Sequence, residues 1–348
     1  MAFEYSPSQG VEVAVGVGGA AVTPANNGLS AFRSPTPAQL AITAQDFQNH
    51  SSGWTRQKSA MGRQTWRVGF SFFFQHSSAA SPTGAGDDVP RAIGVYEMAG
   101  LDGTVTAAPD TFILDPIANL TTELNPASRA AGGGDPGPNA IEVFTAGTRG
   151  TGIKRTGSAA YCNLVISGRS GEPVLARADC TAIFAEPTSS AGLTSWATGS
   201  VYTDVMHAVA CAITPNGGSA YTPVFQSFEF NLNNRVVEIE DANAATGLKE
   251  IALVDQAPTL RFDLAQDTDA SANLAIADLY ADVTGADHHS VAFKASASAV
   301  EGRIWNFLFP TAQPIDLPES DNNGYRRQGI MYKVQGTTPG IEFSITGT

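Results

Sequence analysis

Between residues 66 and 74 the chain reads Trp66-Arg67-Val68-Gly69-Phe70-Ser71-Phe72-Phe73-Phe74. Large apolar side chains occupy every second position of this stretch, at Trp66, Val68, Phe70, Phe72 and Phe74. Successive side chains of an extended strand point to opposite faces, so these five share one face. The pattern predicts a half-buried β-strand and makes a helix untenable here.

The same alternation recurs outward from this stretch in both directions. It predicts strands at 11–17, 141–146, 159–167, 173–185, 205–213, 228–232, 237–239, 260–264, 290–297, 302–309, 326–335 and 341–346. The segment 168–171, Gly-Arg-Ser-Gly, is a hairpin signal between two of them. The last two strands are expected to pair with each other through residues 336–340. The chain therefore reads as a mainly β protein.

Helices are few and turns are many. Pro90 suits the opening of a helix of three to four turns, and Asp269 can cap a second helix from about 270 to 283. The chain contains 35 Gly and 20 Pro, which favours short elements joined by turns. Pro310, Pro314 and Pro318 predict a link between strands.

The order of these elements suggests two similar halves. Each half has an aromatic strand, a loop, one helix, further strands and a closing hairpin. We therefore expect two β-sandwich or tube-type units, each covered by an α-helix. The predicted boundaries are an N-terminal arm with a short strand at 1–50, a first unit at 51–186, a connector at 187–224 and a second unit at 225–348.

Composition excludes several classes of protein. Charged residues make up 15% of the 348 residues, and the net charge is −13. Surfaces that grip nucleic-acid phosphates are basic, so such a surface is not expected. No apolar run approaches the roughly 20 residues of a membrane-spanning helix. No Lys or Arg precedes Arg33, which argues against a secretory signal.

Candidate catalytic and metal-binding motifs fail on spacing. Glycine patterns at 16–21 and 132–137 mimic a dinucleotide fingerprint, but nearby prolines and turn residues block the helix it requires. His288 and His289 follow Asp278 and Asp282, yet no third metal ligand has a suitable spacing, so two solvated histidines are expected. The three cysteines, Cys162, Cys180 and Cys211, read as small buried hydrophobes in a reducing compartment. We predict no catalytic residue, no cofactor and no metal.

Three segments resemble one family of structural proteins. Residues 225–243, Phe-Gln-Ser-Phe-Glu-Phe-Asn-Leu-Asn-Asn-Arg-Val-Val-Glu-Ile-Glu-Asp-Ala-Asn, resemble a stretch of the tail tube proteins of long-tailed bacteriophages (siphophages). The segment 147–152 resembles the Gly-Arg-Gly hairpin of the same proteins, and 324–345 resembles their closing Arg-Arg-Gln hairpin. The pattern covers roughly residues 54–348.

This resemblance implies a structural virion protein and no enzyme. Family members form rings whose sheets join into a ring-wide β-barrel, and the stacked rings conduct genomic double-stranded DNA without binding it specifically. Two tube units in one chain imply a trimeric, pseudo-hexameric ring, with a hexamer as the alternative. The implied partners are further copies of the chain, a tape measure protein and a tail terminator. The implied location is the virion tail, after assembly in the host cytoplasm, with no membrane involved.

Two other classes of protein stay open. One is a different virion β protein, such as a capsid decoration or distal-tail protein. The other is a non-viral β-sandwich binding module. A module of that kind would favour a secretion signal and a cluster of surface aromatics.

Four carboxylates alternate with apolar residues on the predicted strands of the second half: Glu229, Glu238, Glu240 and Asp263. If the apolar residues face the core, the acids face the other side. We expect them to line the channel, because like charge keeps DNA from sticking to a wall. The alternative is that they only solubilise the exterior.

Overall fold

The computed structural model confirms a mainly β protein, with its strands paired antiparallel. It describes residues 11–18, 28–29, 31–33, 39–45, 60–74, 92–107, 110–117, 137–145, 151–191, 205–206, 211–215, 218–265, 281–285, 287–295, 304–322, 325–336 and 342–347.

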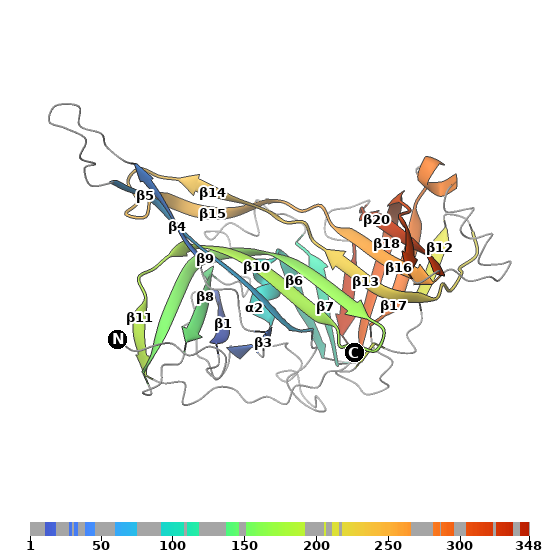
Figure 1. Ribbon diagram of the computed structural model, residues 1–348, viewed down its shortest axis with the longest axis horizontal. Helices are drawn as coiled ribbons and strands as arrows, with labels where there is room; N and C mark the ends of the chain where they lie inside the picture. The colour runs from blue at the N-terminus through green and yellow to red at the C-terminus, as the bar shows by residue number, and fades with distance from the viewer. Residues whose placement is uncertain are drawn as a thin grey trace.

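Three long strands run through the middle of the molecule: β5 (Ala60–Phe73), β9 (Thr151–Arg169) and β10 (Leu175–Phe184). β10 lies between the other two, as Figure 1 shows. The alternating side chains of β5 are all buried, from Trp66 to Phe74, as the sequence predicts. The hairpin between β9 and β10 is also confirmed, and Gly171 takes a positive φ of 83° in its turn.

β9 joins the two halves of the chain in one sheet. Its last five residues pair with β13 (Phe225–Asn231), and β13 pairs in turn with β16 (Thr259–Ala265). β16 then pairs with β20 (Tyr325–Val334). The strand order β5–β10–β9–β13–β16–β20 is therefore continuous across both predicted units.

Further strands extend this sheet at the first half of β9 and beside β5. β8 pairs with β9 and with β1, β1 also pairs with β2, β3 and β4 pair with β5, and β11 pairs with β9. Their bounds are Val11–Gly18 (β1), Gly28–Leu29 (β2), Ala31–Arg33 (β3), Gln39–Gln45 (β4), Gly137–Thr145 (β8) and Thr188–Ala191 (β11). The described part of residues 1–50 thus supplies four paired strands, where one short strand was expected.

β18 (Trp305–Asp316) pairs with three other strands of the second half of the chain. One edge of β18 pairs with β17, and the other edge pairs first with β21 and then with β20. β12 pairs with β17, β7 with β21, β6 with β7, and β19 with β20. Their bounds are Leu101–Ala107 (β6), Asp110–Pro116 (β7), Cys211–Pro215 (β12), His289–Lys294 (β17), Glu319–Asn322 (β19) and Ser344–Gly347 (β21).

Two expectations about this region are wrong. Pro310 and Pro314 lie inside β18 and not in a link, and the register of β18 shifts next to each of them. Pro318 does lie in a link, between β18 and β19. The closing hairpin also does not form, since β20 and β21 pair with opposite ends of one edge of β18 and not with each other. The Arg-Arg-Gln segment at 326–328 instead pairs with β19.

The first predicted helix is shorter than expected. α2 (Ile93–Met98) has six residues. It ends before Gly100, whose φ is 79° and whose added Cβ would lie 2.6 Å from Leu253 Cδ2, so the site excludes a side chain. Of the helix expected from 270 to 283, only the end is described, and residues 281–285 are helical. Its earlier part and Pro90 lie outside the described residues.

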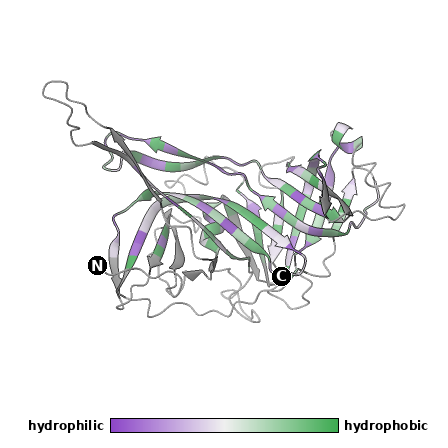
Figure 2. Ribbon diagram, in the orientation of Figure 1, coloured by the Kyte–Doolittle hydropathy of each residue, from purple (hydrophilic) through white to green (hydrophobic). Residues whose placement is uncertain are grey.

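A single aromatic core serves both halves. Phe293 on β17 and Phe307 on β18 stack with ring centroids 4.8 Å apart, and Phe228 on β13 packs against both. Phe74 at the end of β5 reaches the same Phe307. Figure 2 shows hydrophobic and hydrophilic residues alternating along the strands around β13 and β16. The division into two tube-type units with boundaries at 186 and 225 stays a prediction.

Candidate functional site

The side chains that alternate with the core residues form a polar outer face on the central sheet. Residues directly opposite one another in antiparallel strands share a face. Arg169, Ser227 and Asp263 form one such row across β9, β13 and β16. The neighbouring row contains Ser167, Glu229 and Arg261. Charged groups of both signs therefore lie side by side on this face.

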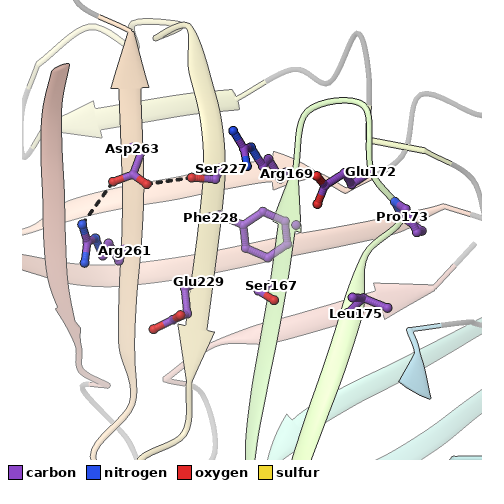
Figure 3. Close-up of a pocket in the computed structure, with 11 residues that line it drawn as sticks. Ser167, Arg169, Glu172, Pro173, Leu175, Ser227, Phe228, Glu229, Arg261 and Asp263 are labelled. Atoms are coloured by element: carbon purple, nitrogen blue, oxygen red, sulfur yellow. Dashed lines mark hydrogen bonds and ion pairs between the residues drawn. The ribbon is translucent and has the colours of Figure 1, made fainter. Parts of the chain in front are cut away.

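These two rows line a hollow of about 310 Å³ in the outer face. The turn between β9 and β10 forms its second wall (Figure 3). The lining residues are Ser167, Gly168, Arg169, Glu172, Pro173, Leu175, Ser227, Phe228, Glu229, Arg261 and Asp263. Its lining combines polar and charged side chains with the apolar Pro173, Leu175 and Phe228.

Asp263 is the best-bonded acid of the hollow. Ser227 Oγ donates to Asp263 Oδ2 at 2.8 Å, and Arg261 Nη2 donates to Asp263 Oδ1 at 3.4 Å. The side chains of Arg261 and Asp263 are 54% and 38% exposed, so solvent screens this ion pair and it adds little to stability. Among the described residues no ion pair involves Arg169, Glu172 or Glu229.

A two-stranded arm continues β13 and β16 beyond the sheet. It consists of β14 (Arg235–Glu240) and β15 (Leu248–Asp255), which pair with each other. In Figure 1 the arm runs along the top of the molecule towards the ends of β4 and β5. There the backbone N–H of Gln64 donates to the Thr246 carbonyl at 3.1 Å. The arm therefore lies across the outer face and is tied to it at its far end.

A cluster of side-chain amides fixes the point where the arm leaves the sheet. Asn163 Nδ2 donates to Asn231 Oδ1 at 3.0 Å, and the backbone N–H of Asn234 donates to Asn163 Oδ1 at 3.0 Å. Asn234 Nδ2 donates to the carbonyls of Ala99 at 2.6 Å and Cys162 at 2.9 Å. Gln256 Nε2 donates to Asn234 Oδ1 at 3.1 Å. These hydrogen bonds join the arm to β9 and to the end of α2.

Apolar contacts hold the inner face of the arm. Leu253 and Ile117 form a small buried cluster, against which Val236 and Tyr161 pack. Val236 is opposite Leu253, and Glu238 is opposite Ile251, which is 2% exposed. Val236 and Glu238 therefore point towards the sheet.

The structure brings together two of the four candidate acids. Glu229 and Asp263 both line the hollow and alternate with buried Phe228, Phe230, Phe262 and Leu264, as predicted. Glu238 and Glu240 lie on the arm, away from that pair. Glu238 faces Arg67 of β5, with Arg67 Nη2 3.4 Å from Glu238 Oε1. Whether any of the four faces a channel stays a prediction.

The alternation on β14 is the reverse of the expected one. Val237 and Ile239 were expected to face a core, but both are only half-buried. The arm lies outside the main core, and its opposite face, which carries Val236, packs against the sheet. Arginines also interleave with the acids of the outer face, at Arg67, Arg169, Arg177 and Arg261. A wall of uniform negative charge is therefore not what this face presents.

His289 is buried and not solvated as expected. Its Nε2 lies 2.8 Å from Asp282 Oδ2, and its Nδ1 lies 3.2 Å from the Tyr332 hydroxyl. A carboxylate can only accept, so Nε2 carries a proton and donates it to Asp282. Burial, with Tyr221 as a further cause, raises the pKa of Tyr332 well above its usual range. His288 is half-buried, with its Nε2 3.3 Å from Gln335 Oε1.

The other site chemistry is limited in the part of the chain that the structure describes. No group of three His, Cys, Asp or Glu side chains is placed to hold a metal ion there. Within the same residues, no helix is long and apolar enough to cross a membrane. Burial raises the pKa of Cys211 to about 12 and that of Tyr96 above its usual value. Neither group is thereby prepared for nucleophilic chemistry.

Comparison with known proteins gives no relative: no family model matches the chain, and no curated protein matches it. The hollow, the arm and its amide joint are the features from which a function must be argued. The sequence pointed to the acids of the hollow and to the Asn-Asn pair. It did not point to Asn163 or Gln256, which lie 71 and 22 residues from Asn234 in the chain and carry no local motif.

Proposed function

We propose that this protein is the major tail tube subunit of a long-tailed bacteriophage, a structural virion protein that assembles into stacked rings. The observation that carries the proposal is the one-sided central sheet. Its inner face covers the aromatic core, while its outer face is polar and has an arm lying across it. A sheet whose inner face is buried against a core and whose outer face is polar suits the wall of an aqueous channel.

Open strand edges supply a physical route to assembly. Among the described residues β6 pairs only with β7, and β14 and β15 pair only with each other. Unpaired edges invite pairing with another chain, and closure into a ring removes them. The three charges of the hollow without ion pairs, on Arg169, Glu172 and Glu229, favour a polar contact with a neighbouring subunit.

The ring is proposed to be a trimer with pseudo-sixfold symmetry. In this arrangement each chain contributes two tube units, so three chains supply six. A hexamer follows instead if only one half of the chain lines the channel. Tape measure protein, tail terminator and passing double-stranded DNA are the partners that this role implies, and none of them calls for a specific binding pocket.

Negative-stain microscopy of the purified protein tests the proposal. Tubes of stacked rings are the expected result, and projections down the tube axis should show three equivalent outer features. Strict sixfold symmetry in those features would contradict the trimer but keep the tube. Isolated trimers that bind capsids would favour a decoration protein. Monomers at high concentration would favour a binding module that uses the hollow, and would end the tube proposal.

A further inference from the structure

Two of the three cysteines face each other across neighbouring strands. Cys162 on β9 is directly opposite Cys180 on β10, and both point into the core, with exposures of 0% and 3%. The Cys162 thiol also lies 3.6 Å from the Val95 carbonyl of α2. Cys211 is on β12, opposite Phe293, and takes no part in this contact.

The strand register already meets the main requirement of a disulfide. Directly opposite residues of antiparallel strands have Cα atoms about 4.5 to 5.5 Å apart. Disulfides span Cα separations of roughly 4.4 to 6.8 Å. Their Cβ atoms must approach to about 3.8 Å, which is slightly closer than usual for cross-strand neighbours. A bridge here needs no movement of the strands along each other.

We propose that Cys162 and Cys180 are a redox-active pair that closes to a cross-strand disulfide when the protein meets a small disulfide oxidant such as oxidised glutathione. One cysteine loses its proton, and its thiolate attacks the glutathione disulfide and releases a glutathione thiolate. The second cysteine, after losing its proton, attacks the resulting mixed disulfide and releases the second glutathione. The pair gives up two electrons and two protons, and one glutathione disulfide becomes two thiols.

Burial controls how fast this reaction runs. Burial is the main reason why the pKa of the Cys180 thiol lies well above its usual range, and the neighbouring Cys162 raises this pKa further. Only the thiolate attacks a disulfide, so exchange is slow while β9 and β10 stay packed. Exchange should accelerate when β10 separates transiently from β9, as in urea below the unfolding midpoint. This inference does not depend on the role proposed above.

The test uses the full chain and glutathione at several ratios of oxidised to reduced form, with and without urea below the unfolding midpoint. The protein is then unfolded in guanidinium chloride so that N-ethylmaleimide blocks every free thiol, buried ones included. The product is analysed by intact mass and peptide mapping. We expect a form with one blocked thiol instead of the three present in the sequence, with Cys162 and Cys180 in one bridged peptide pair. Urea should raise its rate of formation at least tenfold, and a reductant should reverse it.

Matched variants separate this pair from chance oxidation. Cys211→Ala should form the same bridge, whereas Cys162→Ala and Cys180→Ala should each keep two blockable thiols. Far-UV circular dichroism checks that each variant folds, and the wild-type peptide map decides the question if one does not. Three blocked thiols at every ratio, or a bridge that contains Cys211 or links two chains, would overturn the proposal.

Discussion

The side chain of Asn234 bridges two backbone carbonyls, those of Ala99 and Cys162, at 2.6 and 2.9 Å. Ala99 lies at the end of α2 and Cys162 in the middle of β9. A single amide therefore fixes the base of the arm to two elements that precede it by 135 and 72 residues.

We expect Asn234→Ala to lower the free energy of unfolding by about 2 kcal/mol, because three side-chain hydrogen bonds are lost: those to the Ala99 and Cys162 carbonyls and the one from Gln256. Urea denaturation measures the change. Asn243→Ala in the exposed loop of the arm is the matched control and should stay within about 0.5 kcal/mol of the parent. Equal losses in both variants would show that the amide joint has no special role.

Ala159 marks a bulge in β9, where a residue with a side chain takes a φ of 47°. The register between β9 and β10 shifts at the same place. Glycine takes this conformation without strain, so Ala159→Gly should raise the unfolding free energy by up to about 1 kcal/mol. Ala160→Gly is the control at the next, fully buried position and should lower it by a similar amount. Thermal and urea unfolding of the two variants should therefore move in opposite directions.

Stability should fall in alkali because of Cys211. Burial raises the pKa of this thiol from 9.0 in the unfolded chain to about 12 in the folded protein. The unfolded chain therefore loses this proton first, so the contribution is full below pH 9 and is lost as the pH rises towards 12. The loss from this group alone is about 1.4 kcal/mol per pH unit in that window. Urea midpoints measured from pH 8 upwards should fall less steeply for Cys211→Ala. Equal slopes for both proteins would contradict this assignment.

The channel role of the acids is tested by changing Glu229, Glu238 and Glu240 together to Lys. We expect tubes to form still, because these side chains lie outside the core, whereas DNA ejection should slow, most at low salt where screening is weakest. Glu186→Lys, on the exposed link after β10, is the charge control. Normal ejection by the triple variant at low salt would place these acids outside the channel.

Glu229→Lys alone is the sharper version of the same experiment. Glu238 faces Arg67 of β5, so a lysine at that position adds repulsion between the arm and β5 as well as charge on the surface. Glu229 makes no ion pair with another described residue, so its replacement changes the hollow and leaves the arm intact. Slower ejection in the single variant would assign the effect to the outer face of the sheet.

Local patterns in the sequence predicted the strands that lie over the core. The alternation from Trp66 to Phe74 and that around Phe228 and Phe262 matched β5, β13 and β16, because one face of each is buried. The same reasoning failed on β14, whose half-buried valine and isoleucine face away from the sheet. Hydrophobic alternation identifies two faces but not which of them has a partner.

Contacts between residues far apart in the chain could not be predicted from the sequence for a related reason. Nothing near Cys162 indicates that Cys180 is its cross-strand neighbour until the register of β9 and β10 is known, although the hairpin signal at 168–171 was recognised. The proline rule misjudged β18, since it assumes a regular ladder and this strand has two register shifts. The amides around Asn234 come from distant segments, and only the folded chain brings them together.

The pairing of β21 with β7 has a consequence for how the chain reaches its native state. Ile345 lies opposite Leu114, so this ladder closes a loop of more than two hundred residues. Loops of that size form late, because their ends meet rarely before the intervening strands have condensed. Until β21 has been synthesised, the edge of β7 that pairs with it has no partner strand. We therefore expect slow folding with a lag set by synthesis, during which a chaperone or a neighbouring nascent chain competes for that edge.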